Sequence, residues 1–245
     1  RTLNHNENVR AAVFSPDGTI LATAGRGGTA RLWDTTTGRA LRTLNHNENV
    51  RAAVFSPDGT ILATAGSGGT ARLWDTTTGR ALRTLNHTGP VNVTAFSPDG
   101  TRLATASEDG IARLWDTTTG RALHTLTHNE DVRAAVFSPD GTKLATATEN
   151  AAARLWDTTT GRPLHTLNHT ASVAAFSPDG TTLATGGIDG TTRLYDTATG
   201  HLSRTLTHLD SVTVVAFSPD GRTLATGGVD GGVQLSDLTV GQPLR

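Results

Sequence analysis

Phe14-Ser15-Pro16-Asp17-Gly18 is the stretch that decides the fold, because the same residues recur along the whole chain. Further copies begin at Phe55, Phe96, Phe137, Phe176 and Phe217, so the spacings are 41, 41, 41, 39 and 41 residues. A fixed period of about 20 to 50 residues indicates stacked units, none of which can bury its apolar surface alone. The sequence therefore predicts a repeat protein whose binding surfaces are shared between units.

The third repeat shows what one unit contains. Residues 91–96 (VNVTAF) are rich in β-branched and aromatic side chains and end at the SPDG turn of residues 97–100. Residues 101–106 alternate between the two faces of a strand, and residues 111–115 (IARLW) and 121–126 form two further strands. Pro presets the backbone for such a turn and Gly accepts a positive φ. Each repeat is therefore predicted to be a four-stranded antiparallel meander.

Composition excludes several classes of function. The chain of 245 residues carries 21 Lys and Arg against 22 Asp and Glu, a net charge of −1, which gives no reason to expect nucleic-acid or membrane binding. No apolar run approaches 18 residues, so no transmembrane helix is expected. The absence of Cys excludes disulfides and thiolate metal sites and favours a cytoplasmic location. Met is also absent, so we expect a fragment of a longer protein.

A Trp-Asp pair recurs in the third strand of the repeats, at 33–34, 74–75, 115–116 and 156–157. Degenerate copies follow at Tyr195-Asp196 and Ser236-Asp237. A four-stranded unit with this pair every 41 residues resembles the WD-repeat β-propeller family, and the resemblance covers the whole chain. It implies an all-β propeller of four-stranded antiparallel blades, forming a single domain over residues 1–245.

The two ends of the chain bear on how the ring closes. Residues 242–245 begin an outermost strand and residues 1–4 finish one. Together they would form one split outer strand, which hides the open edges of the sheets. The sequence favours a closed ring of six blades and a monomer. The alternative is an arc of a larger ring, completed by a repeat that is missing here or by another chain.

The resemblance implies a polar network that anchors each blade. In the third repeat its members are His87, Thr105, Asp109 and Trp115. A His of this kind needs a fixed tautomer, which an Asp acceptor and a hydroxyl group can supply. Repeats one and two have Gly27 and Gly68 where the Asp belongs. We expect these two blades to be held by packing or by water, and an Asp introduced there to stabilise them.

Catalysis and metal binding have weak support in the sequence. Each repeat-locked His lies on a different blade, too far from the others to share a metal ion. The Asp that follows the Trp position recurs in six turns, which indicates a turn cap. The Gly-rich residues 25–29 join two strands and precede no helix, so they form no phosphate loop. We expect no catalytic residues, no cofactor and no metal.

The top face of the propeller is the predicted interaction surface. In the WD-repeat family, partners are commonly bound there by the residue five after the His and by the residue before the Asp position. The first set is Arg10, Arg51, Asn92, Arg133, Ala174 and Thr213. The second set is Arg26, Ser67, Glu108, Glu149, Ile188 and Val229. Blades one and two are basic, so a protein or peptide partner is expected to be acidic.

The fifth repeat is the irregular one. It is two residues shorter than the others, and the interval from Val173 to Phe176 compared with that from Val132 to Phe137 places the deletion in its first strand. An even deletion preserves the alternation of the strand, so we expect the strand to pack.

Two functions stay open on this evidence. The first is a non-catalytic scaffold for protein or peptide interaction, as a fragment of a larger bacterial protein. The second is an engineered or recently amplified symmetric propeller without an evolved ligand, because residues 1–41 and 42–82 differ only at Arg26 and Ser67.

Overall fold

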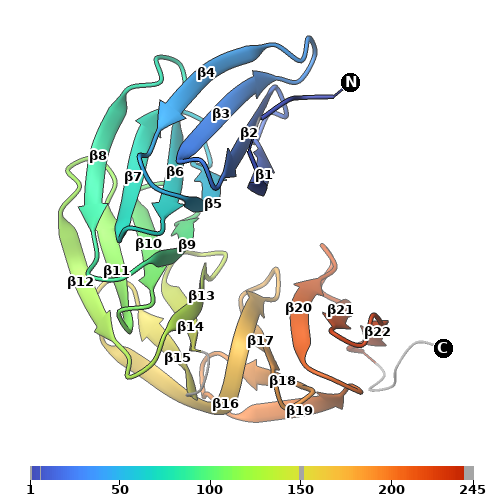
Figure 1. The fold of residues 1–245 in the computed structure, drawn as a ribbon. Helices are drawn as coiled ribbons and strands as arrows, with labels where there is room; N and C mark the ends of the chain where they lie inside the picture. Colours follow the sequence, from blue (N-terminus) through green and yellow to red (C-terminus); the bar gives the residue numbers. More distant parts are fainter. Residues whose placement is uncertain (1, 6, 149–151, 240–245) are drawn as a thin grey trace. The chain divides into compact units, whose positions relative to one another are not determined.

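The repeated strands expected from the sequence are present. The structure, a computed structural model, describes residues 2–5, 7–148 and 152–239. These contain 22 β-strands and no α-helix, and they fall into six blades (Figure 1). The all-β, antiparallel fold is therefore confirmed. The described residues contain no helix long and apolar enough to cross a membrane.

The chain divides into two compact units, each treated by itself below. Unit 1 is residues 1–127 and contains blades 1 to 3; unit 2 is residues 128–245 and contains blades 4 to 6. The assignment of residues 1–245 to one domain stays a prediction. Closure by residues 242–245 with residue 1 lies outside the described residues.

Unit 1 consists of three four-stranded sheets, each in sequential order. Blade 1 has β1 (Val9–Phe14), β2 (Ile20–Gly25), β3 (Thr29–Asp34) and β4 (Ala40–Asn45). Blade 2 has β5 (Val50–Phe55), β6 (Ile61–Gly66), β7 (Thr70–Asp75) and β8 (Ala81–Asn86). Blade 3 has β9 (Val91–Phe96), β10 (Arg102–Ser107), β11 (Ile111–Asp116) and β12 (Ala122–Thr127).

Unit 2 is less regular, because blades 4 and 5 share a strand. Blade 4 has β13 (Val132–Phe137), β14 (Lys143–Thr148), β15 (Ala152–Asp157) and the first part of β16 (Pro163–Phe176). Blade 5 has the second part of β16, then β17 (Thr182–Gly187), β18 (Thr191–Asp196) and β19 (Leu202–Thr207). The described part of blade 6 has β20 (Val212–Phe217), β21 (Thr223–Gly228) and β22 (Val233–Asp237).

The SPDG turn is held by its own side chains. In blade 1 the Ser15 hydroxyl donates to Asp17 Oδ1 over 2.6 Å, and the Thr19 backbone N–H donates to the same oxygen over 3.1 Å. Gly18 has a φ of 72°, which the turn requires and which glycine adopts without strain. Because these bonds are local, the turn forms wherever the sequence occurs. It sets the register of the first two strands.

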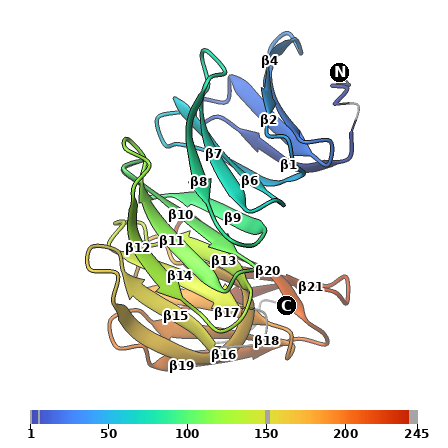
Figure 2. The ribbon, with the colours of Figure 1, turned by 60° about the vertical axis from the view of Figure 1, so that its left-hand side comes forward.

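Apolar side chains between neighbouring blades form the core of each unit. In unit 1, Ala22 and Leu32 of blade 1 share a buried cluster with Val50, Phe55 and Leu62 of blade 2. Figure 2 shows the successive sheets of this unit. Burying one such leucine or phenylalanine contributes about 1.5–3 kcal/mol. The blades are therefore stabilised by their neighbours, as expected of a repeat protein.

The deletion in the fifth repeat lies in a loop rather than in the first strand, where the sequence had placed it. Ala171 pairs with Gly187 and Phe176 pairs with Leu183, so the strand has its full length. Thr170 still pairs with Ala152 of blade 4. Removing two loop residues has joined the outer strand of blade 4 to the inner strand of blade 5. This is why β16 runs unbroken through both blades.

Candidate functional site

The top face of each unit is the end of its blades that carries two kinds of loop. One is the turn between the second and third strands, and the other is the loop that leads to the first strand of the following blade. The anchoring His residues belong to the second kind of loop, where His46, His87, His128 and His208 directly follow β4, β8, β12 and β19, whereas His169 lies within β16. The geometry of the anchors therefore decides how the top face is held.

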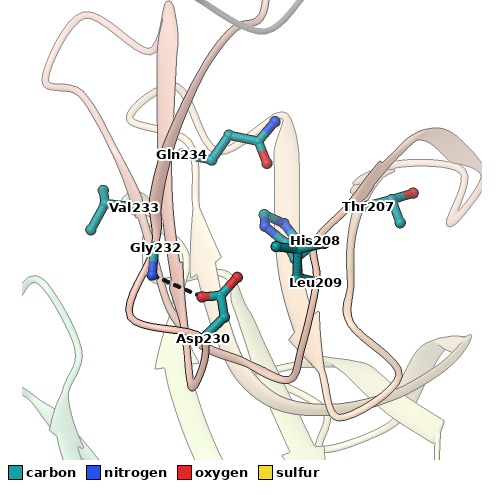
Figure 3. A pocket seen from close by; sticks show the side chains of 7 residues that line it. All are labelled: Thr207, His208, Leu209, Asp230, Gly232, Val233 and Gln234. Atoms are coloured by element: carbon teal, nitrogen blue, oxygen red, sulfur yellow. Dashed lines mark hydrogen bonds between the residues drawn. The ribbon is translucent and has the colours of Figure 1, made fainter.

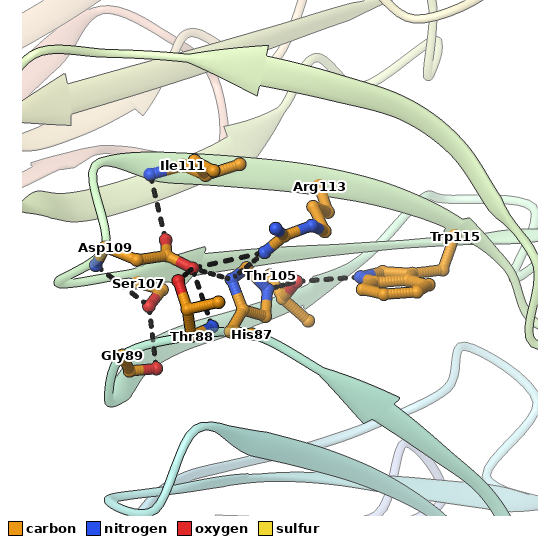
Figure 4. Close-up of polar contacts among 9 residues, drawn as sticks. All are labelled: His87, Thr88, Gly89, Thr105, Ser107, Asp109, Ile111, Arg113 and Trp115. Atoms are coloured by element: carbon orange, nitrogen blue, oxygen red, sulfur yellow. Dashed lines mark hydrogen bonds and ion pairs between the residues drawn. The ribbon is translucent and has the colours of Figure 1, made fainter.

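The blade 3 anchor joins both kinds of loop to the sheet (Figure 4). The Trp115 indole N–H donates to Thr105 Oγ1 over 2.8 Å, and His87 Nε2 lies 2.6 Å from the same hydroxyl. His87 Nδ1 lies 3.3 Å from Asp109 Oδ2. The structure thus brings together all four residues that the sequence predicts for this network. His87 and Thr105 are buried.

Asp109 also organises the loops above the ring of His87. Its carboxylate accepts bonds from the backbone N–H groups of Thr88 and Ile111, both over 3.0 Å. Arg113 Nη1 lies 3.3 Å from Asp109 Oδ2. Burial alone would raise the pKa of Asp109, but the Thr88 N–H and the neighbouring His87 and Arg113 outweigh it and lower the pKa. The carboxylate is therefore ionised at neutral pH.

In blades 1 and 2 the carboxylate beside the His comes from the loop that contains the His, and not from the turn between the second and third strands. The sequence-based expectation missed this. In blade 1 the Gly27 N–H donates to Glu7 Oε2 over 2.9 Å, and that oxygen lies 3.8 Å from His5 Nδ1. In blade 2 Glu48 accepts from the Gly68 N–H and lies 3.5 Å from His46 Nδ1. A Glu two residues after the His takes the place of the absent Asp.

The expectation that Asp at position 27 would stabilise blade 1 therefore fails on geometry. A Cβ atom added to Gly27 would overlap the Glu7 carboxyl group, and one added to Gly68 would overlap that of Glu48. Neither glycine has a positive φ, so the obstacle is the Glu side chain and not the backbone. In blade 3 the arrangement is reversed: a Cβ at Gly89, two residues after His87, would lie 2.9 Å from the Asp109 nitrogen.

The other anchors vary within the same theme. In blade 4 His128 Nε2 lies 3.1 Å from Thr146 Oγ1, which also accepts from the Trp156 indole; Asn150 lies outside the described residues. In blade 5 His169 contacts Thr185 and Asp189 at 2.6 and 3.3 Å. In blade 6 the Ser236 hydroxyl is buried without a hydrogen-bond partner among the described residues.

Three buried histidines, His46, His87 and His128, are neutral at physiological pH. Burial, reinforced by the charge of Arg113, lowers the pKa of His87 to about 4, and Asp109 only partly opposes this shift. Burial and Arg154 lower the pKa of His128 to about 4 as well. Burial also lowers the pKa of His46, with Glu48 opposing. A neutral ring suits a structural anchor, and among the described residues no cluster of three His, Cys, Asp or Glu could hold a metal ion.

The predicted basic rim of unit 1 is divided by one ion pair. Arg10 and Arg26 are exposed, and their guanidinium groups have no carboxylate partner among the described residues. Arg51 instead reaches to blade 3, where its Nη1 lies 2.5 Å from both Glu108 Oε1 and Asn92 Oδ1. In blade 2 the position equivalent to Glu108 is Ser67, which has no carboxylate. The two free guanidinium groups therefore belong to blade 1.

The top face of unit 2 has a different character. Arg133 is paired with Asp131 over 3.2 Å, whereas Ile188, Thr213 and Val229 are exposed; Glu149 lies outside the described residues. The assignment of Ala174 to this face is wrong, because counting from His169 ignores the shortened loop. Ala174 pairs with Thr185 inside the sheet, and Ser172 occupies the bulge equivalent to Arg10 and Arg51.

Comparison with known protein families agrees with this geometry. The model of the WD domain, G-beta repeat, matches residues 1–34, 38–75, 79–116, 120–157, 161–196 and 200–237. The chain belongs to the WD-repeat family. WD repeats generally act as protein–protein interaction scaffolds, and WD propellers are typically not enzymes. The comparison with curated proteins found no match to this WD-repeat chain.

Proposed function

We propose that this chain is an interaction scaffold whose unit 1 top face binds an acidic protein segment. The observation that carries the proposal is a contrast between three arginines. Arg10 and Arg26 are exposed and have no carboxylate partner among the described residues, whereas Arg51 forms an ion pair with Glu108. Arg10 lies in the bulge at the start of β1, and Arg26 lies in the turn between β2 and β3 of the same blade. A partner with two or more carboxylates on an extended segment fits them.

The chemistry of arginine sets the expected strength of this contact. A guanidinium group can bind a carboxylate through two parallel hydrogen bonds, which a single ammonium group cannot do. An exposed pair of this kind contributes only about 0.2–1 kcal/mol and is screened by salt. We therefore expect modest affinity that falls as ionic strength rises.

One observation favours a second candidate function. Residues 1–41 and 42–82 differ at a single position, so the repeats have had little time to acquire separate roles. A recently amplified or engineered propeller without an evolved ligand would have this property. The proposed acidic partner and this alternative predict opposite results in one binding experiment.

The experiment is a fluorescence anisotropy titration with a labelled glutamate-rich peptide at low salt. The parent should bind, and Arg10→Gln with Arg26→Gln should weaken binding about tenfold, while Arg51→Gln should change it little. Arg39→Gln with Arg80→Gln, in exposed turns at the other end of the blades, is the matched control. No binding by the parent would favour the propeller without a ligand, and equal binding by the double variant would move the site elsewhere.

A further inference from the structure

The top face of unit 2 carries an apolar patch formed by Ile188, Leu209 and Val229. Their exposed fractions are 54, 94 and 66 %. Ser211 joins the three loops, because its hydroxyl donates to the Ile188 carbonyl over 3.2 Å and its carbonyl accepts from the Val229 N–H over 3.0 Å. Ile188 and Val229 occupy second-set positions, which in unit 1 hold Arg26, Ser67 and Glu108. Exposed apolar side chains gathered on loops that are joined in this way are typical of an interaction site.

Each apolar residue of the patch is followed directly by an aspartate. Asp189 is already engaged, with Arg193 at 3.2 Å and His169 at 3.3 Å. Among the described residues, the carboxylates of Asp210 and Asp230 accept hydrogen bonds only from the backbone N–H groups of Ser211 and Gly232, over 2.6 and 2.9 Å. Neither has a lysine or arginine partner among the described residues. The patch is therefore bordered by two carboxylates that lack a cation.

A pocket of about 260 Å³ opens beside the patch (Figure 3). Leu209 supplies its apolar side chain, and Asp230, His208 and Gln234 supply its polar groups, whereas the Val233 side chain points to the other face of β22. Leu209 is 94 % exposed, so a ligand can reach it. His208 Nε2 lies 3.0 Å from Thr192 Oγ1. Burial lowers the pKa of His208 despite the nearby Asp230, so the ring adds no positive charge at neutral pH.

From this arrangement we propose that the pocket of blade 6 binds the lysine or arginine side chain of a partner protein, next to an apolar residue of that partner. The methylene stem packs on Leu209, and the cationic head pairs with Asp230. The neighbouring apolar residue covers Ile188 and Val229. This inference goes beyond the function proposed above, because it concerns the other unit and a partner segment of opposite charge.

The test uses the full chain and a short labelled peptide in which a leucine stands between two lysines. Fluorescence anisotropy should show binding by the parent. Asp230→Asn keeps the acceptor for the Gly232 N–H, and Leu209→Ser changes a side chain that is 94 % exposed, so both variants should fold. Each should weaken binding about three- to tenfold, the size expected for exposed contacts.

Matched control variants distinguish binding at this pocket from non-specific electrostatic or hydrophobic binding. Glu130→Gln removes an exposed carboxylate of blade 4, and Leu82→Ser removes a leucine of unit 1 that is 37 % exposed; both should bind as the parent does. Peptides with glutamate for lysine, or serine for leucine, should bind less. The proposal is overturned if the parent does not bind the lysine peptide, or if both pocket variants bind it as tightly as the parent. Neither result bears on the acidic peptide and Arg10.

Discussion

The carboxyl group of Glu7 fills the space that a side chain at position 27 would need, and it accepts a hydrogen bond from the Gly27 N–H over 2.9 Å. Gly89 and Asp109 show the opposite arrangement in blade 3. In blades 1, 2 and 3 the loops thus hold one acid beside the anchoring His, on either of two loops, with a glycine facing it. We regard this exchange as the central feature of the top face of unit 1.

The anchors of blades 1 and 3 should differ in strength. His87 contacts both a hydroxyl and a carboxylate, whereas His5 Nδ1 has no hydrogen-bond partner among the described residues. Leaving buried partners unsatisfied costs about 1–3 kcal/mol. His87→Ala should therefore lower the free energy of unfolding by about that amount, and His5→Ala by less. Urea denaturation of both variants measures this, and equal losses would show that the blade 3 network has no special weight.

The protein should lose stability in mild acid. The pKa of His87 and of His128 is about 4 in the folded chain and about 6.5 when unfolded, so the unfolded state binds more protons between these values. The free energy of unfolding therefore falls as the pH falls from about 6.5 to about 4, by on the order of 2–3 kcal/mol for each residue. Denaturation midpoints measured across this window test the sign, and a flat profile above pH 4 would contradict the buried neutral rings.

The continuous strand β16 should be visible in hydrogen exchange. Thr170 and Ala171 pair with Ala152 and Gly187, whereas residues 129–131 of the preceding repeat form a loop. Amides within a paired strand exchange more slowly than those in exposed loops. The amides of residues 170 and 171 should therefore be protected and those of 129–131 should not. Equal rapid exchange in both segments would mean that β16 is broken at the joint.

The sequence was sufficient to predict the features that depend on residues close together along the chain. The SPDG turn forms from Ser15, Asp17 and Gly18 alone, so strands and blades followed from reading one repeat. The blade 3 anchor was predictable because all four residues stand at their usual spacing. Ala174 was misassigned because counting from a His fails when the loop has been shortened, and only the register revealed Ser172.

Glu7 and Glu48 were missed for a different reason. The family pattern fixes the acid at one position, but the ring requires only a carboxylate within reach, and a longer side chain supplies it from the opposite loop. The signal was present in the sequence, because repeats one and two combine Glu with Gly where repeat three combines Gly with Asp. Similarly, the contact from Arg51 to Glu108 depends on which blades are neighbours, and a single repeat does not show it.

The exchange of acid between two loops is tested most directly by a double-mutant cycle at positions 7 and 27, read as the free energy of unfolding in urea. Glu7→Gly should destabilise by about 1 kcal/mol, since it removes the carboxylate. Gly27→Asp should also destabilise, because two carboxylates then compete for one site. The double variant reproduces the arrangement of blade 3 and should recover at least about 1 kcal/mol relative to the sum of the single changes. Additive losses, or a stabilising Gly27→Asp on its own, would contradict the account.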